Sequence, residues 1–397
     1  MRFLIASELP SRIRYYPGLL HIFRLVWYSP FLYTGGRLQP ISHSMKSTVL
    51  IDAERLRSPA NGLGQVSLNL SRELMQLRSD YWRPVFLVPK HRQDILGETA
   101  EIEVAGWKRR HLPQFGRRFG LWHVTHQDSV FCPNPGTRYV LTIHDLNFLK
   151  EKSPEKAAKR LAKVQALVDG ATWITTISEF TRGVVEEHLH LGDTPVTVIY
   201  NAPCTDPDLT AARPPNVPDD EFLLALGVVR PKKNLHVLMG FLARVEDVKL
   251  VIAGNNESDY LDRLLSEAQE HGVLDRVVVT GEVSEAEKLW LLQNCKALTF
   301  PSLLEGFGLP VIEAMSYGKP VFCSHLTSLP EIGGDAAYYW HDFNPDSMAT
   351  VYKDGMAALE ADPDGANKLR ARAAEFNWAD AAKRYGDLYE TILAEQD

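Results

Sequence analysis

Short apolar segments alternate with amphipathic ones along most of the chain, starting at about residue 45. An apolar run of strand length predicts a buried strand, and apolar residues three or four positions apart predict a helix. In the first half the predicted strands cover residues 48–53, 84–88, 121–124, 139–143, 173–177 and 196–200. The predicted helices cover residues 64–78, 154–169 and 179–189, with Ser178 as the N-cap of the last one. This alternation is typical of a doubly wound parallel sheet.

The alternation restarts after residues 201–220, a polar stretch with five prolines that cannot form the interior of a helix or strand. Further strands are predicted at residues 222–226, 248–253, 276–280 and 296–300, with helices at 234–243, 258–271, 284–294 and 378–394. We therefore predict an α/β protein with two doubly wound domains. They cover residues 45–203 and 221–375, joined by a linker of residues 204–220 and followed by a C-terminal helical segment, 376–397.

Residues 1–44 do not fit this pattern, because they hold five arginines, one acidic residue and many aromatic residues. One interpretation is an amphipathic anchor at a membrane interface. The other, which we favour, is a translated leader upstream of a start at Met45. In both cases the segment is expected to lie outside the core. Its apolar stretches are interrupted, so the sequence predicts neither a transmembrane helix nor a secretory signal.

The net charge of −7 divides into +8 for residues 1–200 and −15 for residues 201–397. Different partners are therefore expected for the two halves. The basic residues are not interleaved with stacking aromatics, so nucleic acid is not an expected partner. An anionic membrane surface or a phosphate-bearing acceptor fits better. One basic cluster is either a lipid-phosphate contact or a solvated loop; its members are Lys108, Arg109, Arg110, Arg117 and Arg118.

The four cysteines have no C-x-x-C spacing and no paired histidines, which indicates reduced thiols and a cytoplasmic protein. Two D-x-D triplets occur, Asp206–Asp208 and Asp362–Asp364. Such triplets hold Mn²⁺ or Mg²⁺ in one class of sugar-transferring enzyme, but both are centred on proline in loop-like sequence. We interpret them as turns, and expect no metal and no cofactor.

The stretch from Phe300 to Pro320 reads as a strand end, a glycine loop and a short helix, with Pro310 at the first helical position and Gly318 just past the end. A glycine loop that leads into a helix N-terminus is an anion site, because its backbone N–H groups point outward. Glu305 and Glu313 flank the loop. A carboxylate would repel a phosphate, so each glutamate is expected to accept hydrogen bonds from hydroxyl groups. A nucleotide sugar supplies both diphosphate and hydroxyls.

Glu305 and Glu313, eight residues apart around GFGLP, resemble the E-x7-E signature of retaining glycosyltransferases of the family-4 type. The alternative is a structural loop with two surface glutamates. The resemblance covers roughly residues 46–395, and FNWADAAKRYGDLYETIL resembles the family helix that crosses back to the first domain. It implies the GT-B fold, in which two Rossmann-like domains face a cleft.

The resemblance assigns donor-binding roles in the second domain. Glu313 would bind the ribose and Glu305 the hexose, while the diphosphate would meet Lys233, Lys232 and the loop formed by Gly306, Phe307 and Gly308. Cations are needed here because the leaving group is a nucleoside diphosphate. Many relatives place an arginine where this chain has Val228, so Lys232 or Arg230 is expected to compensate. The backbone around Val283 would meet the nucleobase.

The first domain would contribute acceptor-side residues. Gly62 and Gly64 resemble a loop that approaches the donor phosphate and the acceptor. His144 follows a predicted strand, and ligands bind beyond the carboxyl ends of strands in open α/β sheets. By resemblance His144 lies beside the transferred sugar, and Asp145 either orients its imidazole or contacts the acceptor. His123 and His126, near an earlier strand end, are further candidates, and Glu331 is expected to order the fold.

The function implied is a metal-independent, retaining hexosyltransferase of polysaccharide or lipopolysaccharide biosynthesis, with mannose from GDP-mannose as the first guess. The acceptor would be a saccharide or a lipid-linked saccharide at the inner face of the membrane. His144 and Glu305 are the candidate catalytic residues. Retention would follow from attack on the face from which the diphosphate leaves, with no protein nucleophile. A phosphorylase is not favoured, because no lysine context suggests pyridoxal phosphate. A sugar-nucleotide epimerase and a non-catalytic binding protein remain alternatives.

Overall fold

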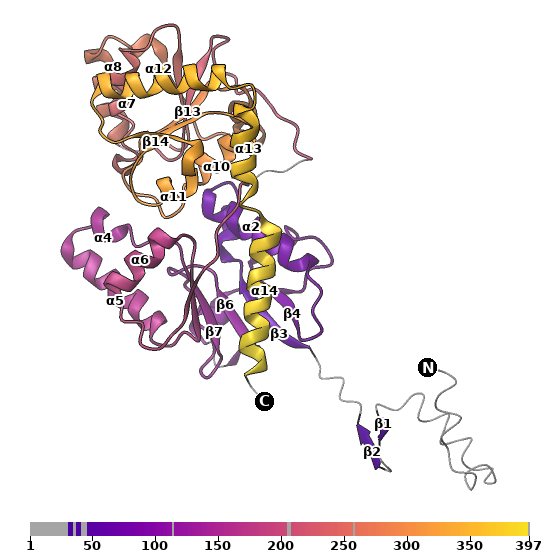
Figure 1. Cartoon of the computed structure of the whole chain (residues 1–397). Helices are drawn as coiled ribbons and strands as arrows, with labels where there is room; N and C mark the ends of the chain where they lie inside the picture. Colours follow the sequence, from indigo (N-terminus) through magenta and orange to yellow (C-terminus); the bar gives the residue numbers. More distant parts are fainter. Residues whose placement is uncertain are drawn as a thin grey trace, which may run out of the picture. The chain divides into compact units, whose positions relative to one another are not determined.

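The computed structural model describes residues 31–34, 37–40, 46–112, 115–204, 208–256 and 259–395 (Figure 1). The chain divides into two compact units, residues 1–46 and 47–397. Within the first unit, β1 (Phe31–Thr34) and β2 (Arg37–Pro40) pair in antiparallel fashion. The other residues among positions 1–44 lie outside the described residues, so the structure does not distinguish the two interpretations of this segment.

The first sheet of the larger unit has seven parallel strands in the order β5-β4-β3-β6-β7-β8-β9. Their bounds are β3 (Ser47–Asp52), β4 (Trp82–Pro89), β5 (Ile102–Ala105), β6 (Leu121–Val124), β7 (Tyr139–Ile143), β8 (Trp173–Thr176) and β9 (Val196–Val198). The connecting helices are α2 (Gly62–Gln76), α3 (Trp107–His111), α4 (Phe148–Glu151), α5 (Pro154–Val168) and α6 (Glu179–His188). Central strands β6 and β7 are buried along their whole length, as apolar runs in a doubly wound sheet require.

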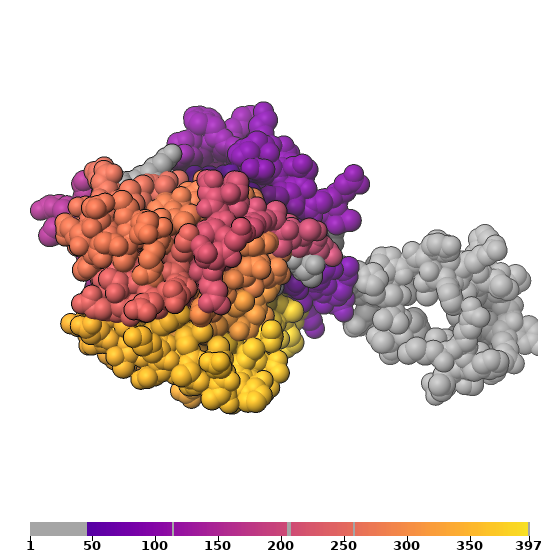
Figure 2. Space-filling model, turned by 90° about the horizontal axis from the view of Figure 1, so that it is seen from above, coloured from indigo at the N-terminus to yellow at the C-terminus, as the bar shows by residue number. Residues whose placement is uncertain are grey.

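The second sheet has six parallel strands in the order β12-β11-β10-β13-β14-β15. Their bounds are β10 (Phe222–Leu226), β11 (Lys249–Ala253), β12 (Val277–Gly281), β13 (Ala297–Phe300), β14 (Val321–Ser324) and β15 (Tyr338–Trp340). The helices are α7 (Val237–Leu242), α8 (Tyr260–Glu270), α9 (Glu285–Asn294), α10 (Leu309–Ser316), α11 (Leu329–Gly333), α12 (Pro345–Ala361) and α13 (Gly365–Ala374). In Figure 2 the C-terminal part of the chain, coloured yellow, lies along one side of this domain.

The last helix, α14 (Trp378–Ala394), returns to the first domain, as predicted. It lies beside α2 (Figure 1), and its residues Leu388, Tyr389 and Ile392 are buried. The Tyr389 ring meets Trp82 edge-on at 5.1 Å, and its hydroxyl lies 2.6 Å from Nδ1 of His123. The final helix therefore belongs to the core of the first domain.

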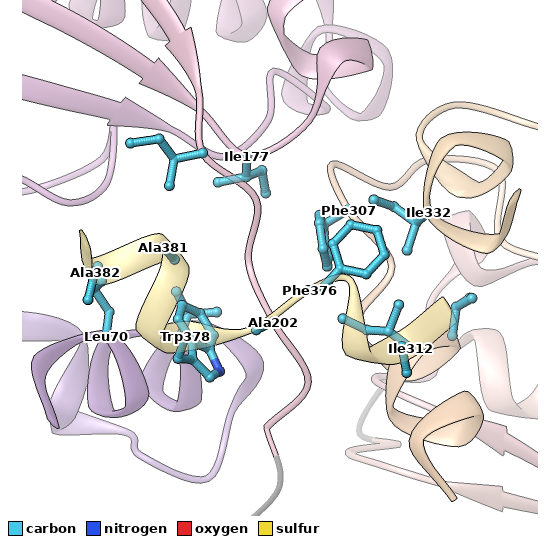
Figure 3. Packing of buried hydrophobic residues seen from close by; sticks show 14 of the residues in the cluster. Leu70, Ile177, Ala202, Phe307, Ile312, Ile332, Phe376, Trp378, Ala381 and Ala382 are labelled. Carbon is cyan, nitrogen blue, oxygen red and sulfur yellow. The ribbon is translucent and has the colours of Figure 1, made fainter. Parts of the chain in front are cut away.

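One hydrophobic cluster contains buried residues of both domains. It includes Ala202, in the irregular segment that connects the two domains. In Figure 3, Leu70, Trp378, Ala381 and Ala382 lie on one side of that stretch. Phe307, Ile312, Ile332 and Phe376 lie on the other. The Trp378 indole also donates to the carbonyl of Pro203, 3.1 Å away. The two domains therefore share buried apolar surface. Among the described residues, no helix is long and apolar enough to cross a membrane.

Candidate active site

The glycine loop after β13 has the predicted conformation. Gly308 is the N-cap of α10 at φ 109°, and Gly318 follows the helix at φ 71°. The helix begins at Leu309, so Pro310 is its second residue and not, as predicted, its first. A Cβ on Gly308 would lie 2.6 Å from Leu329 Cδ2. Gly306 is constrained differently, because a Cβ there would lie 2.2 Å from the carbonyl oxygen of His144. The loop of the second domain thus touches the first domain where β7 ends.

Lys233 and Glu305 lie together next to this loop. Lys233 ends a short 3₁₀ turn, and its Nζ is 2.6 Å from Oε1 of Glu305 and 4.5 Å from the centre of the Phe300 ring. Ser302 donates to the same carboxylate oxygen at 2.6 Å. The candidate diphosphate cation and the candidate hexose-binding carboxylate are therefore within reach of one ligand. Lys232 turns towards the first domain, where its Nζ is 3.3 Å from Oε1 of Glu151.

Glu313 is 4% exposed and has a partner that sequence reasoning missed. Lys288 of α9 places its Nζ 3.3 Å from Oε1 of Glu313 and 2.7 Å from Oε2 of Glu285. Burial lowers the pKa of Lys288, but the two carboxylates outweigh burial and raise it overall. The capping box of Ser284 and Glu287 fixes the start of α9. The capping box can be recognised in the sequence, but the pairing of Lys288 with Glu313 cannot.

His144 lies directly after β7 and is 6% exposed. Its Nε2 is 2.9 Å from the Thr125 carbonyl, which can only accept, so Nε2 carries the proton. Burial lowers the pKa of His144 to about 4, so the imidazole is neutral at pH 7. Asp145 accepts from the Asn147 N–H at 2.9 Å, and burial raises its pKa. The imidazole is thus oriented by Thr125, and the Asp145 carboxylate is engaged in its own turn.

The other two candidate histidines, His126 and His123, have different surroundings. The His126 ring stacks on His144 with 5.0 Å between centres, and its Nδ1 accepts from Arg55 Nη2 at 3.0 Å. His123 is fully buried between Tyr389 and Thr142, and burial lowers its pKa to about 3. His123 therefore holds α14 to the sheet. His126 instead lines a cavity next to His144; the cavity is also lined by Arg55, Ser67, Thr125, Asn201 and Trp378.

The Gly62–Gly64 loop prediction was wrong in its boundary, because α2 begins at Gly62 and not at residue 64. Asn61 is the N-cap and accepts from the Gly64 N–H at 2.8 Å. A Cβ on Gly64 would lie 2.1 Å from the Ser58 carbonyl, so close packing explains this glycine. Gly62 has room for a Cβ, whose nearest neighbour would be Leu309 of α10 at 3.8 Å. The N-termini of α2 and α10 therefore approach each other.

The remaining predicted positions are placed as follows. Val283 is half-buried and packs against the shared cluster, and Val228 is 39% exposed. Ser178 caps α6 by accepting from the Thr181 N–H, as predicted. Asp362 accepts from the Asp364 N–H at 3.0 Å, which confirms a turn there. The other D-x-D triplet lies mostly outside the described residues.

The basic cluster is split by the fold. Arg109 is 4% exposed, lies over Trp122 at 4.7 Å, and donates to the Arg117 carbonyl at 3.0 Å. It is therefore not available to a lipid phosphate. Lys108, Arg110 and Arg118 are exposed, and so are three large apolar residues of the same segment: Trp107, Leu112 and Phe115.

The chain is similar in sequence to known glycosyltransferases. Residues 209–376 match the family model described as Glycosyl transferases group 1. The serotype-specific mannosyltransferase WbdA of Escherichia coli is 33% identical over 175 residues, which are 41% of this chain and 21% of WbdA. The chain thus spans about a fifth of that relative's length. O-antigen chain mannosyltransferase B of Escherichia coli is 22% identical over 392 residues, covering 87% of this chain and all of that one.

Solved structures show the fold. Sucrose-phosphate synthase from Thermosynechococcus elongatus superposes with a TM-score of 0.64 at 19% identity, covering 88% of this chain and all of that one. Anabaena Alr3699/HepE in complex with UDP and glucose gives 0.67 at 16% identity, covering 87% of this chain and all of that one. The larger unit therefore has the GT-B fold, with two Rossmann-like sheets. The roles given above to single residues stay predictions.

Proposed function

We propose that this protein, whose residues 209–376 match the family model Glycosyl transferases group 1, transfers a hexose from a nucleotide sugar to a saccharide acceptor. The observation that carries the proposal is the meeting of three groups. Lys233 and Glu305 lie 2.6 Å apart, and the glycine loop that adjoins them touches the His144 carbonyl of the other domain. A cation, a hydroxyl-binding carboxylate and a helix N-terminus together fit the diphosphate and sugar of one donor.

The proposed chemistry needs no protein nucleophile. The diphosphate would bind to Lys233 and to the amides of the glycine loop. Lys233 would then no longer pair with Glu305, so the Glu305 carboxylate could accept hydrogen bonds from hexose hydroxyls. Glu313 would bind the ribose, with Lys288 holding its carboxylate in place. The acceptor would attack on the face from which the diphosphate departs, with retention. Lys233 and Lys232 would stabilise the charge on the leaving group, so we expect activity without a divalent metal.

His144 would act as a neutral group beside the sugar. Because Nε2–H of His144 donates to the Thr125 carbonyl, Nδ1 is the unprotonated nitrogen. Nδ1 can therefore accept a hydrogen bond from a sugar hydroxyl. Because its pKa is about 4, no protonation of His144 is expected in the working range of pH. This supports a positioning contact and disfavours a proton transfer through His144.

We propose mannose from GDP-mannose as the donor. Several similar proteins are named mannosyltransferases, and one from Komagataeibacter xylinus, 28% identical over 191 residues, is named as using GDP-mannose and a diphosphopolyprenol-linked acceptor. A lipid-linked acceptor would bring the enzyme to the inner face of the membrane. The exposed segment with Trp107, Leu112 and Phe115 beside three cations supports peripheral contact with an anionic bilayer. All four cysteines are free thiols, which supports a cytoplasmic setting.

The test is release of nucleoside diphosphate from a panel of GDP-, UDP-, ADP- and dTDP-sugars, with and without EDTA. Glu313→Ala is compared with Glu360→Ala, which changes an exposed glutamate of α12. Selective, EDTA-resistant release that depends on Glu313 and not on Glu360 supports the proposal. Conversion of the donor without any acceptor would favour an epimerase, and donor binding without turnover a binding protein. Neither binding nor release with any donor would overturn it.

A further inference from the structure

Helix α6 of the first domain is capped by a carboxylate of the second domain. The backbone N–H groups of Glu179 and Phe180 donate to the two oxygens of Glu331, at 2.7 and 3.0 Å. These are first-turn amides with no partner inside the helix. Ser178 already satisfies the amide of Thr181 from within the first domain. Glu331 therefore supplies the rest of the cap from the opposite side of the domain boundary.

The same end of α6 also holds the glycine loop. The Ser178 hydroxyl donates to the Gly306 carbonyl at 2.7 Å, and the Thr181 hydroxyl lies 3.1 Å from that oxygen. Thr181 Oγ1 is also 3.3 Å from the His144 carbonyl. The candidate donor loop, His144 and the first turn of α6 thus form one contact region. Glu331 borders it.

Glu331 is itself held firmly in the second domain. Arg372 Nη2 donates to the Glu331 carbonyl at 2.5 Å, and Arg372 Nε donates to the Ile332 carbonyl at 3.0 Å. The Glu331 carboxylate also has a neighbour in Tyr200, next to the linker. Burial and a hydrogen bond with Glu331 both raise the pKa of the Tyr200 hydroxyl. A carboxylate fixed on one domain and bonded to the backbone of the other is suited to set their spacing.

We propose that Glu331 is a positioning residue, which keeps the donor loop at residues 305–308 in register with His144 by joining α11 to the N-terminus of α6. The inference rests on the proposed function, because register between donor loop and His144 matters only for transfer. Reacting groups carried by two domains meet correctly only when the domains are held in one arrangement. The donor contacts themselves, Lys233, Glu305 and Glu313, all lie in the second domain and do not depend on Glu331.

The experiment compares Glu331→Ala, Glu331→Gln and the control Glu187→Gln, a carboxylate of α6 that is 74% exposed. Amide hydrogen exchange at residues 178–182 reports on the cap, and kcat and the Kd of the nucleoside diphosphate report on the site. In Glu331→Ala we expect exchange at Glu179 and Phe180 to rise about tenfold, kcat to fall roughly tenfold to a hundredfold, and the Kd to change less than about twofold. Glu331→Gln, which keeps one acceptor oxygen, should fall between, and Glu187→Gln should match the wild type.

Unchanged exchange or unchanged kcat in Glu331→Ala overturns the inference while wild-type transfer stands. Parallel loss of kcat and nucleotide binding also overturns it, because that pattern indicates general destabilisation. An inactive wild type overturns the proposed function and the inference together, whatever the exchange shows. Faster exchange with a selective loss of kcat supports both.

Discussion

Lys233 and Glu305 are bonded to each other, with Nζ 2.6 Å from Oε1, although they are expected to hold different parts of one donor. Both side chains are about 15% exposed, so the pair is partly screened from solvent. A donor would have to separate or bridge them. The Lys233–Glu305 pair itself therefore carries no net charge before a ligand binds.

We predict that Lys233→Ala reduces kcat/KM by about a hundredfold, because the developing charge on the diphosphate loses its nearest cation. The matched control is Lys296→Ala, since Lys296 also forms a 2.6 Å ion pair, with Glu221, but on the surface. Steady-state kinetics with the identified donor and the Kd of the nucleoside diphosphate check the prediction. Equal losses in the two variants would show that Lys233 has no special role.

Gly306→Ala tests the contact between the domains. Its Cβ would lie 2.2 Å from the His144 carbonyl, a backbone atom that cannot move aside alone. We expect activity to fall about a hundredfold, as for a small misplacement of reacting groups. Gly183→Ala is the control, because a Cβ there meets nothing within 4 Å and alanine favours the helix by roughly 0.5–1 kcal/mol. An active Gly306→Ala variant would mean that the loop does not need its place beside His144.

Lys288→Met tests the buried pair with Glu313. Removing one partner leaves the other charge buried, which typically destabilises a fold by about 3 kcal/mol. Glu285→Ala removes only the outer, 28% exposed carboxylate and should cost much less. Urea unfolding measures both variants. The raised pKa of Lys288 means that its contribution is present below the unfolded value of 10.5 and is lost at higher pH. Equal stabilities of wild type and Lys288→Met would refute the pairing.

Much of the site could be predicted because its signals are local. The Gly318 boundary of α10 and the Ser178 cap depend on neighbouring residues in the chain, and both were confirmed, whereas Pro310 is the second helical residue and not the first. Strand β10 was predicted residue for residue. Local signals failed at α2, where Asn61 caps a helix that begins two residues earlier than predicted.

Other features were missed because distant segments create them. Lys288 and Glu313 are 25 residues apart on different helices, and Glu331 meets α6 about 150 residues away. Strands β5, β14 and β15 were not predicted either, although β6, β9 and β13, which are equally short, were. Runs so short carry little periodicity, and pairing with neighbours in the sheet defines them.

Buried neutral histidines give a pH prediction. The pKa of His144 is lowered to about 4 and that of His123 to about 3, and burial also lowers the pKa of His126. Between these values and 6.5, the unfolded histidines bind protons and the folded ones do not. Stability therefore falls as pH falls, by about 1.4 kcal/mol per pH unit for each excess proton in the unfolded state.

Asp52 acts with the opposite sign, because burial raises its pKa to about 6 and its folded form binds a proton first. Asp52→Asn should therefore show a steeper loss of stability than the wild type between pH 6 and pH 5. Urea unfolding at pH 7, 6 and 5 measures both slopes. Stability of the wild type that rises on acidification in this range would contradict the assignment of neutral histidines.

The exposed segment of the first domain gives the last prediction. Trp107 and Phe115 are 67% and 82% exposed, near Lys108, Arg110 and Arg118, so aromatic insertion and lipid-phosphate attraction would act together. We expect the protein to float with vesicles that contain anionic phosphatidylglycerol and not with pure phosphatidylcholine, and binding to weaken in 0.5 M salt because exposed charges are screened. The double variant Trp107→Ser, Phe115→Ser should lose most of this binding. Tyr81→Ser, which removes an aromatic residue that is 68% exposed and directly precedes β4, should keep it. If the double variant binds as well as the wild type, then this segment does not contact the bilayer, and any membrane contact must come from another part of the chain.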